Sequence, residues 1–342
     1  MNPGISAGTN LGTTAAIFGL SGPDLLPQER DFFRETDPFG FILFARNVET
    51  PDQLRRLTGD LRGAVGRAAP ILVDQEGGRV QRLRAPHWRE WAPPLETAER
   101  AGPDAARLLW LRARLIAQEL HAVGIDADCA PVCDLARPET HAFLKNRCHG
   151  GDPARVAQLG RAVAEGLLAG GVLPVMKHIP GHGRSRLDTH HDLPLVDAPL
   201  AELEGADFSP FRALADLPMA MTGHLVFSAI DAARPATQSP AVVRLIRESI
   251  GFDGLLMTDD LNMEALSGGL ADRTALAMAA GVDIALHCKG DLQGMAQVAG
   301  AAGAMGAATR ARAARALACR RPPAEVDIAG IEAELEALSR PA

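Results

Sequence analysis

The chain has 342 residues, of which 47% are hydrophobic and 23% charged, and its formal net charge is -7. Positive and negative residues are mixed throughout, so the chain lacks the basic footprint that nucleic-acid binding needs. Tyrosine is absent, which excludes every mechanism that uses a phenol as acid, base or nucleophile. These properties favour a soluble enzyme that acts on a small molecule.

Cysteine usage points to a reducing compartment. The chain has five cysteines, an odd number, and none of them forms a CxxC pair. We therefore expect free thiols. The first twenty residues do not have the pattern of a secretory signal, and no stretch of 18 apolar residues is free of charges and helix breakers. We expect a cytoplasmic protein without membrane contact, and a monomer, because no apolar surface helix is left unaccounted for.

Eight short apolar runs, each bounded by turn residues, recur along the chain. Their hydrophobicity is nearly continuous instead of alternating, which is typical of strands buried on both faces of a parallel sheet. In chain order, the predicted strands are Ala15–Leu20, Phe41–Ala45, Ile71–Val73, Ile125–Val132, Leu173–Met176, Met219–Leu225, Leu255–Thr258 and Val282–His287.

Helix-like stretches lie between most of these strands. The clearest is Pro103–His121, in which leucines recur at the helical period before Gly124 ends the helix. The others are Pro51–Gly66, Pro153–Leu168, Leu200–Leu214, Ser239–Ser249, Arg273–Ala280 and Leu292–Ala318. Eight strand-helix units favour a single (β/α)8 TIM-type barrel. An open doubly wound sheet is the competitor, but its glycine-rich phosphate turn is absent after the first strand.

The chain shows no linker or charge run that would divide it. We therefore expect one catalytic barrel domain over residues 1–342, with a C-terminal helix at about 324–338 packed outside.

Four predicted strands end in polar residues. Asp74-Gln75-Glu76 follow the third strand, Lys177-His178 the fifth, His224 the sixth and Asp259-Asp260 the seventh. The alternative for each is a charged residue that merely begins a solvated loop. Because catalytic groups of such barrels project from the carboxyl ends of the strands, four polar ends together favour an active site.

The segment from Lys177 to Asp192 holds four of the ten histidines. Its glycines and Pro180 predict a structured turn, followed by a polar loop over residues 181–192. Asp188 and His190 are two residues apart, so in an extended segment their side chains leave the same face. A carboxylate beside an imidazole makes His190 a plausible proton shuttle. A metal site is the rival, but the HxH and HExxH spacings that preset ligand geometry are absent, and Lys177 adds a cation. We expect no metal and no cofactor.

Asp259 and Asp260 follow an apolar run directly. Adjacent strand residues point in opposite directions, so we expect only one of them to face the barrel centre, where it can be a nucleophile. The alternative for Asp260 is an N-cap of a helix that starts near Asn262.

Taken together, these motifs resemble glycoside hydrolase family 3, in particular its bacterial NagZ-type β-N-acetylglucosaminidases. The motifs occur in the family's order and span Gly40 to about Cys288. They are Asp74-Gln75-Glu76-Gly77-Gly78-Arg79-Val80-Gln81-Arg82, Asn146-Arg147, Lys177-His178, Gly181-His182-Gly183, Asp188-Thr189-His190 and Thr258-Asp259-Asp260-Leu261-Asn262-Met263.

The resemblance implies a barrel that removes terminal β-linked N-acetylglucosamine with retention, in cytoplasmic recycling of cell-wall muropeptides. It implies Asp259 as nucleophile and His190 as acid/base with Asp188 as its partner. The positions that it implies for sugar binding are Asp74, Arg82, Arg147, Lys177 and His178. The expected partner is thus a small carbohydrate.

The chain departs from the family pattern at His149, which bears on the sugar subsite, and at Phe227, where a tyrosine is common. Trp88 and Trp91 are either a stacking platform for the second sugar or a hydrophobic plug under a long loop. Three other functions stay open. They are a phosphorylase of the same family, a metal-dependent amidohydrolase and a non-catalytic sugar-binding barrel.

Overall fold

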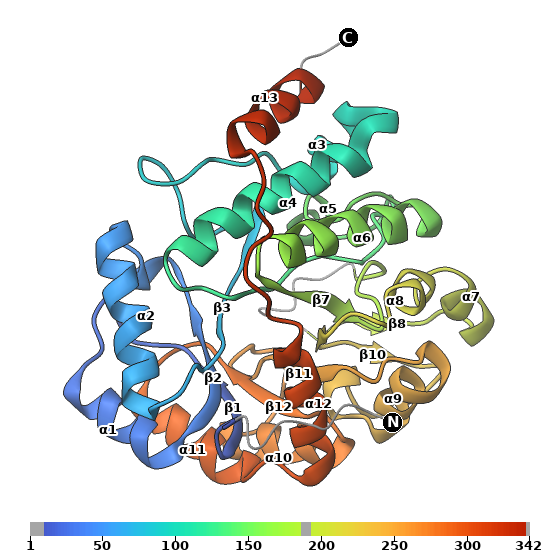
Figure 1. The fold of residues 1–342 in the computed structure, drawn as a ribbon. Coiled ribbons are helices and arrows are strands. Elements are labelled where there is room, and N and C mark those ends of the chain that lie inside the picture. The colour runs from blue at the N-terminus through green and yellow to red at the C-terminus, as the bar shows by residue number, and fades with distance from the viewer. Residues whose placement is uncertain (1–9, 186–192, 340–342) are drawn as a thin grey trace, which may run out of the picture.

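The structure is a computed structural model that describes residues 10–185 and 193–339. In these residues, eight parallel strands close into a barrel in the order β1-β12-β11-β9-β7-β6-β3-β2 (Figure 1). They are β1 (Thr14–Phe18), β2 (Pro38–Leu43), β3 (Ile71–Val73), β6 (Ala127–Asp128), β7 (Leu173–Ile179), β9 (Met219–Thr222), β11 (Leu255–Asp260) and β12 (Ile284–His287). The predicted (β/α)8 barrel is confirmed.

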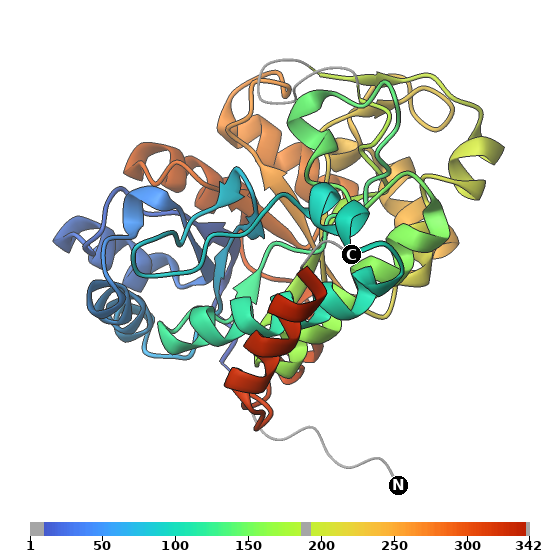
Figure 2. The ribbon, with the colours of Figure 1, turned by 90° about the horizontal axis from the view of Figure 1, so that it is seen from above.

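Helices surround the strands (Figures 1 and 2). They are α1 (Pro27–Thr36), α2 (Pro51–Val65), α3 (Pro94–Ala101), α4 (Ala105–Ala122), α5 (Ala142–Lys145), α6 (Pro153–Ala169), α7 (Leu200–Gly205), α8 (Ser209–Ala213), α9 (Pro240–Leu245), α10 (Leu270–Ala280), α11 (Leu292–Ala302), α12 (Ala307–Ala318) and α13 (Ile328–Ser339). Local sequence explains their starts. Thr50 caps α2 and Asp152 caps α6, each accepting a backbone N–H, and proline follows each cap.

The strands are buried on both faces, as the continuous apolar runs predict. Ile17, Leu72, Val175 and Met257 belong to the cluster that fills the barrel, and each is fully buried. Neighbouring residues such as Phe18 pack outward against the surrounding helices. This double burial makes the barrel a rigid support for the loops at the strand ends.

Three predicted elements are corrected. The helix predicted over Leu292–Ala318 is two helices, because Gly303 adopts a φ of 63° after α11. The stretch Leu200–Leu214 is likewise two short helices, α7 and α8. Of the strand predicted over Ile125–Val132, only Ala127–Asp128 forms β6, and Val132 adds an isolated bridge to Lys177.

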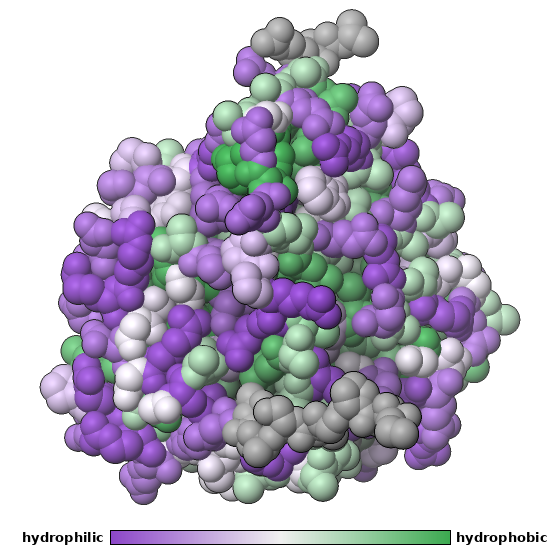
Figure 3. Space-filling view, viewed as in Figure 1, coloured by the Kyte–Doolittle hydropathy of each residue, from purple (hydrophilic) through white to green (hydrophobic). Residues whose placement is uncertain are grey.

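The C-terminal helix α13 lies across α4 on the outside of the barrel (Figures 1 and 2). Its Ile331 packs with Leu111 and Leu115 of α4, and Arg107 pairs with Glu334 at 2.6 Å. Figure 3 shows this side of the molecule as largely hydrophilic, with hydrophobic side chains gathered near the start of α13. Among the described helices, none is both long enough and apolar enough to cross a membrane.

Candidate active site

A polar pocket opens at the carboxyl ends of the strands. Its cavity measures about 150 Å³. Its lining includes the ends of β7 and β11, the residues after β2 and β3, and α5. The charged and imidazole side chains in the described lining are Asp74, Arg82, Arg147, Lys177, His178, His182, Asp259 and Asp260. The predicted sugar-binding residues and Asp259 therefore share one pocket.

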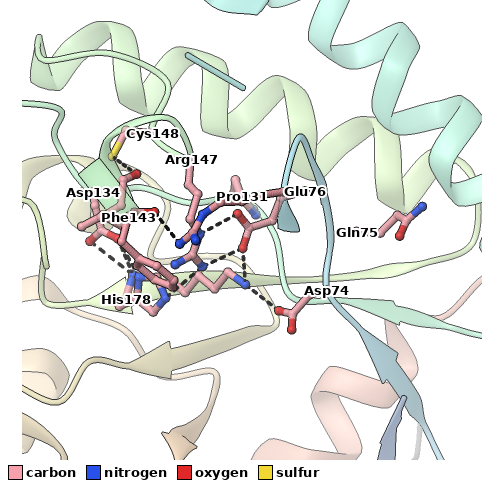
Figure 4. A network of polar contacts seen from close by, with 12 residues as sticks. Asp74, Gln75, Glu76, Pro131, Asp134, Phe143, Arg147, Cys148 and His178 are labelled. Carbon is pink, nitrogen blue, oxygen red and sulfur yellow. Dashed lines mark hydrogen bonds and ion pairs between the residues drawn. The ribbon is translucent and has the colours of Figure 1, made fainter. Parts of the chain in front are cut away.

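An ion-pair network forms one wall of this pocket (Figure 4). Lys177 Nζ lies 2.8 Å from Asp74 Oδ1 and 2.6 Å from Glu76 Oε1. Arg147 donates two hydrogen bonds to Glu76, at 2.8 and 2.9 Å, and Arg82 donates to Asp74 at 2.9 Å. Glu76 was not among the predicted site residues, although it belongs to the same motif as Asp74. The Glu76 carboxylate contacts both buried cations, Lys177 and Arg147.

The network keeps its members charged. Burial favours the neutral form of each group, but the neighbouring opposite charges outweigh burial. The pKa of Glu76 is lowered to about 2 by Arg147 and Lys177, and that of Asp74 lies well below its ordinary value because of Lys177 and Arg82. Burial lowers the pKa of Lys177, but Asp74 and Glu76 outweigh burial and raise it above its ordinary value. The pKa of Arg147 is likewise raised, mainly by Glu76. The pocket wall thus holds fixed charges that can donate hydrogen bonds to a polar ligand and accept them from it.

A second carboxylate that was not predicted, Asp134, orients the histidines of this site. Its Oδ2 lies 2.7 Å from His178 Nδ1, and its Oδ1 accepts the His182 backbone N–H at 2.6 Å. Burial raises the pKa of Asp134, but His178 and His182 outweigh burial and hold it below its ordinary value. Asp134 follows the fourth predicted strand, so the strand-end rule that identified Asp74 would also have found it.

Asp259 and Asp260 both line the pocket, at a point where the pairing of β11 with β12 shifts register. Both residues therefore border the pocket, and the expectation that only one side chain faces the barrel centre stays a prediction. The two carboxylates differ in their hydrogen bonds. Asp259 accepts the Asp260 N–H at 2.8 Å, whereas Asp260 Oδ1 accepts from Asn262 Nδ2 at 2.7 Å and from the Cys288 N–H at 3.1 Å. Asp260 braces the loop, and Asp259 keeps an oxygen for chemistry.

Asp259 is held ready as an anion. Burial raises its pKa, but His178 and His224 outweigh burial and hold the pKa below its ordinary value. The N-cap alternative for Asp260 is wrong, because residues 261–266 form turns and the next described helix, α10, begins at Leu270.

The fourth polar strand end, His224, supports the site from behind. It is fully buried, its Nε2 lies 3.0 Å from the Asp260 carbonyl oxygen, and its Nδ1 lies 2.8 Å from Thr237 Oγ1. Burial lowers the pKa of this histidine. It holds the backbone of β11 through its contact with the Asp260 carbonyl oxygen, and it is not part of the described pocket lining.

The predicted acid/base residues, Asp188 and His190, lie outside the described residues. The chain that leads to them is described as far as Ser185. Thr140 donates to the Gly183 carbonyl, and Arg184 pairs with Asp207 at 2.8 Å. These contacts hold residues 181–185 in place beside the pocket.

Four further residues from the sequence lie away from the described pocket lining. His149 is buried behind the Glu76 wall, and burial lowers its pKa to about 4. Phe227 packs against Phe208. Trp88 is buried in the core and Trp91 packs against it, so both act as a hydrophobic plug. Of the two alternatives for these tryptophans, the packing supports the hydrophobic plug over the stacking platform.

Within residues 10–185 and 193–339, no three His, Cys, Asp or Glu side chains are grouped so that they could hold a metal ion.

Comparisons with known proteins agree on one family. The family model described as "Glycosyl hydrolase family 3 N terminal domain" matches residues 30–318. A beta-hexosaminidase of Alkalilimnicola ehrlichii is 39% identical over 279 residues, covering 80% of both chains. One of Bordetella avium is 35% identical over 277 residues, covering 79% of both. The solved structure of native NagZ from Neisseria gonorrhoeae superposes with a TM-score of 0.82 at 29% identity and covers 96% of both chains.

Proposed function

The chain belongs to glycosyl hydrolase family 3, and from this premise we propose that it is a retaining exo-β-N-acetylglucosaminidase that releases terminal β-linked N-acetylglucosamine. One observation carries the proposal. An ionised carboxylate, Asp259, stands at the end of β11 in a pocket whose wall holds Lys177, Arg147 and His178. The beta-hexosaminidases among its relatives support the same class of substrate.

Asp259 is the nucleophile in this proposal. Its free oxygen attacks the anomeric carbon as the bond to the leaving oxygen breaks, giving a covalent glycosyl-enzyme through an oxocarbenium-like transition state. The lowered pKa of Asp259 keeps it anionic at neutral pH. Asp260, which accepts from Asn262 and Cys288, fixes the backbone that carries the nucleophile.

His190, with Asp188 as its partner, is the proposed acid/base. The imidazolium gives its proton to the leaving oxygen, and the neutral imidazole then takes a proton from the water that attacks the glycosyl-enzyme. An imidazole with an ordinary pKa of about 6.5 can do both near neutral pH. This assignment rests on the family motif.

The glycone is held by the charged wall. Asp74 and Lys177, paired at 2.8 Å, offer an acceptor and a donor to sugar hydroxyls. Arg82, Arg147 and His178 add further hydrogen-bonding groups on the same wall. Because these groups are already oriented by one another, the sugar meets a preorganised site.

The biological substrate that we propose is a cell-wall muropeptide ending in N-acetylglucosamine linked to 1,6-anhydro-N-acetylmuramic acid, degraded in the cytoplasm during peptidoglycan recycling. The likeness to a NagZ structure over 96% of the chain supports this choice.

The test is an NMR time course on an aryl β-N-acetylglucosaminide. We expect the β-anomer of the free sugar to form first; first-formed α-anomer would refute a nucleophilic Asp259. Asp259→Ala should abolish release of the aryl group, whereas Asp260→Asn, which keeps an oxygen acceptor, should retain turnover. An unchanged rate in Asp259→Ala would sink the assignment. Repeating the reaction in phosphate separates the phosphorylase alternative, because a phosphorylase would yield the sugar 1-phosphate.

A further inference from the structure

The backbone of Glu76 is held from outside the barrel by an arginine of α4. Arg112 Nη2 donates to the Glu76 carbonyl oxygen at 2.6 Å, and Arg112 Nη1 donates to Thr97 Oγ1 at 2.9 Å. Arg112 is buried, so water does not compete for these hydrogen bonds, and the donor is ionised, which strengthens them. Arg112 thereby links the helix layer to the residue whose carboxylate contacts Lys177 and Arg147.

The residue after Glu76 leaves the space that the Arg112 guanidinium occupies. Gly77 has a φ of 102°, and a Cβ at this position would overlap Arg112 Nη2. Glu76 and Gly77 belong to β4 (Gln75–Gly77), which pairs antiparallel with β5 (Val80–Gln81). A side chain at residue 77 would therefore push the guanidinium away from the Glu76 carbonyl oxygen.

Trp91, one of the two tryptophans of the hydrophobic plug, packs on the same guanidinium. Its ring centroid lies 5.5 Å from the Arg112 guanidinium carbon, and its carbonyl oxygen accepts the Gly78 N–H at 2.7 Å. A cation near an aromatic face is attracted to it. Trp91 thus restrains both Arg112 and the turn that follows Glu76.

Close packing does not fill the space behind Glu76. A small cavity of about 20 Å³ lies there, and its lining includes Glu76 and Arg147 of the pocket wall together with Leu109 and Arg112 of α4. Atoms beside a cavity lack packing contacts on that side. The hydrogen bond from Arg112 therefore supplies a restraint on the Glu76 backbone that packing against α4 does not supply.

We propose that Arg112 is a positioning residue for glycone binding, and that it acts through Glu76. The inference rests on the proposed function, in which Lys177 and Arg147 bind sugar hydroxyls. Both cations contact the Glu76 carboxylate, at 2.6 and 2.8 Å, so a shift of Glu76 displaces two donors together. Binding groups lose much of their effect when they are displaced from the productive geometry. Arg112 is not part of the described pocket lining, so its effect on the sugar passes through Glu76.

The experiment compares Arg112→Met with the matched control Arg114→Met. Both arginines lie on α4, both are buried, and both donate to a backbone carbonyl, Arg114 to that of Ala324 at 3.0 Å. The measurements are steady-state kinetics on an aryl β-N-acetylglucosaminide and calorimetric titration with N-acetylglucosamine. In Arg112→Met, KM and the Kd of the sugar should rise about five- to thirtyfold while kcat stays near the wild-type value, because the lost restraint serves binding. Arg114→Met should leave KM and Kd unchanged.

A role of Arg112 in folding alone predicts a different result, since unfolded molecules lower the apparent kcat and leave the KM of the folded ones unchanged. Wild-type KM and Kd in Arg112→Met, or an equal rise in Arg114→Met, would overturn the inference.

Arg112→Lys decides the question if Arg112→Met does not fold. Lysine keeps the charge but lacks the planar fork that reaches Thr97 and Glu76 together, so KM should rise by a smaller factor. An unchanged KM in this variant would also overturn the inference. If the wild-type protein neither binds N-acetylglucosamine nor releases the aryl group, the proposed function itself fails, and the inference fails with it.

Discussion

The Nδ1 atom of His178 lies 2.7 Å from Oδ2 of Asp134, a carboxylate with no exposed surface. An ionised carboxylate can only accept, so Nδ1 carries the proton that is shared with Asp134. The other ring nitrogen, Nε2, then faces the pocket near Arg147 Nη2, 3.5 Å away. Asp134 therefore decides both the orientation of the imidazole and which of its nitrogens lies near Arg147.

Replacing Asp134 should impair substrate binding more than the fold. In Asp134→Ala, the charge-assisted hydrogen bond to His178 is lost, and we expect kcat/KM to fall roughly 10- to 100-fold, equivalent to about 1.5–3 kcal/mol. Steady-state kinetics on an aryl β-N-acetylglucosaminide measure the effect. Asp283→Asn is the control, because Asp283 is a buried carboxylate that pairs with Arg247 outside the described pocket lining. A fall of the same size in the control would contradict the specific role of Asp134.

The Glu76 carboxylate should stabilise the fold as well as the site. Glu76→Gln leaves Arg147 and Lys177 buried with one anion fewer, and removing one partner of a buried ion pair costs about 3–5 kcal/mol. Urea unfolding at neutral pH should show this loss of free energy of unfolding, together with a higher KM. An unfolding free energy within 1 kcal/mol of the wild type, roughly the range of exposed pairs, would contradict it.

Glu76 also predicts a dependence of stability on acid. Its pKa is about 2 when folded, below the ordinary 4.5, so its contribution is complete above pH 4.5 and is lost as the pH falls toward 2. The Gln variant should show a shallower loss of stability over that interval.

His182 predicts a pH effect closer to neutrality. Burial, with His178 second, lowers the pKa of His182 from 6.5 to about 4, and its Nδ1 has no hydrogen-bond partner among the described residues. The unfolded chain takes up a proton near pH 6.5 that the folded protein refuses until about pH 4, so stability falls as the pH falls through this interval. Thermal unfolding between pH 7 and 4 should show a smaller fall in Tm for His182→Phe.

The control for this experiment is His121→Gln, which removes an exposed imidazole of α4. If His182→Phe and the wild type lose Tm in parallel, His182 is not the group responsible.

Metal removal should leave the activity intact. Retaining hydrolysis by Asp259 and an imidazole draws its acid, base and nucleophile from side chains. Release of the aryl group should therefore proceed at the same rate after dialysis against EDTA. Loss of activity that returns with added divalent metal would favour the metal-dependent amidohydrolase alternative instead.

The sequence by itself determined the barrel and most of the pocket. A strand buried on both faces must be apolar along its whole length, so runs such as Leu255–Met257 are visible without any contact information. Carboxyl ends of parallel strands meet at one end of a barrel, so Asp74, Lys177 and Asp259 could be grouped from their positions alone. The cytoplasmic location, the monomeric state and the acid/base role of His190 stay predictions.

Only the tertiary structure decided how the charges are partnered. Glu76 and Arg147 are 71 residues apart, and no local pattern states that they meet at 2.8 Å. The division of labour between Asp259 and Asp260 depends on a register shift and on Cys288, which comes from beyond the next strand. Phe143 lines the pocket whereas Trp88 is buried in the core, and no local pattern distinguishes these two positions. Each of these contacts depends on packing between segments that are distant in the sequence, because the fold decides which distant side chains become neighbours.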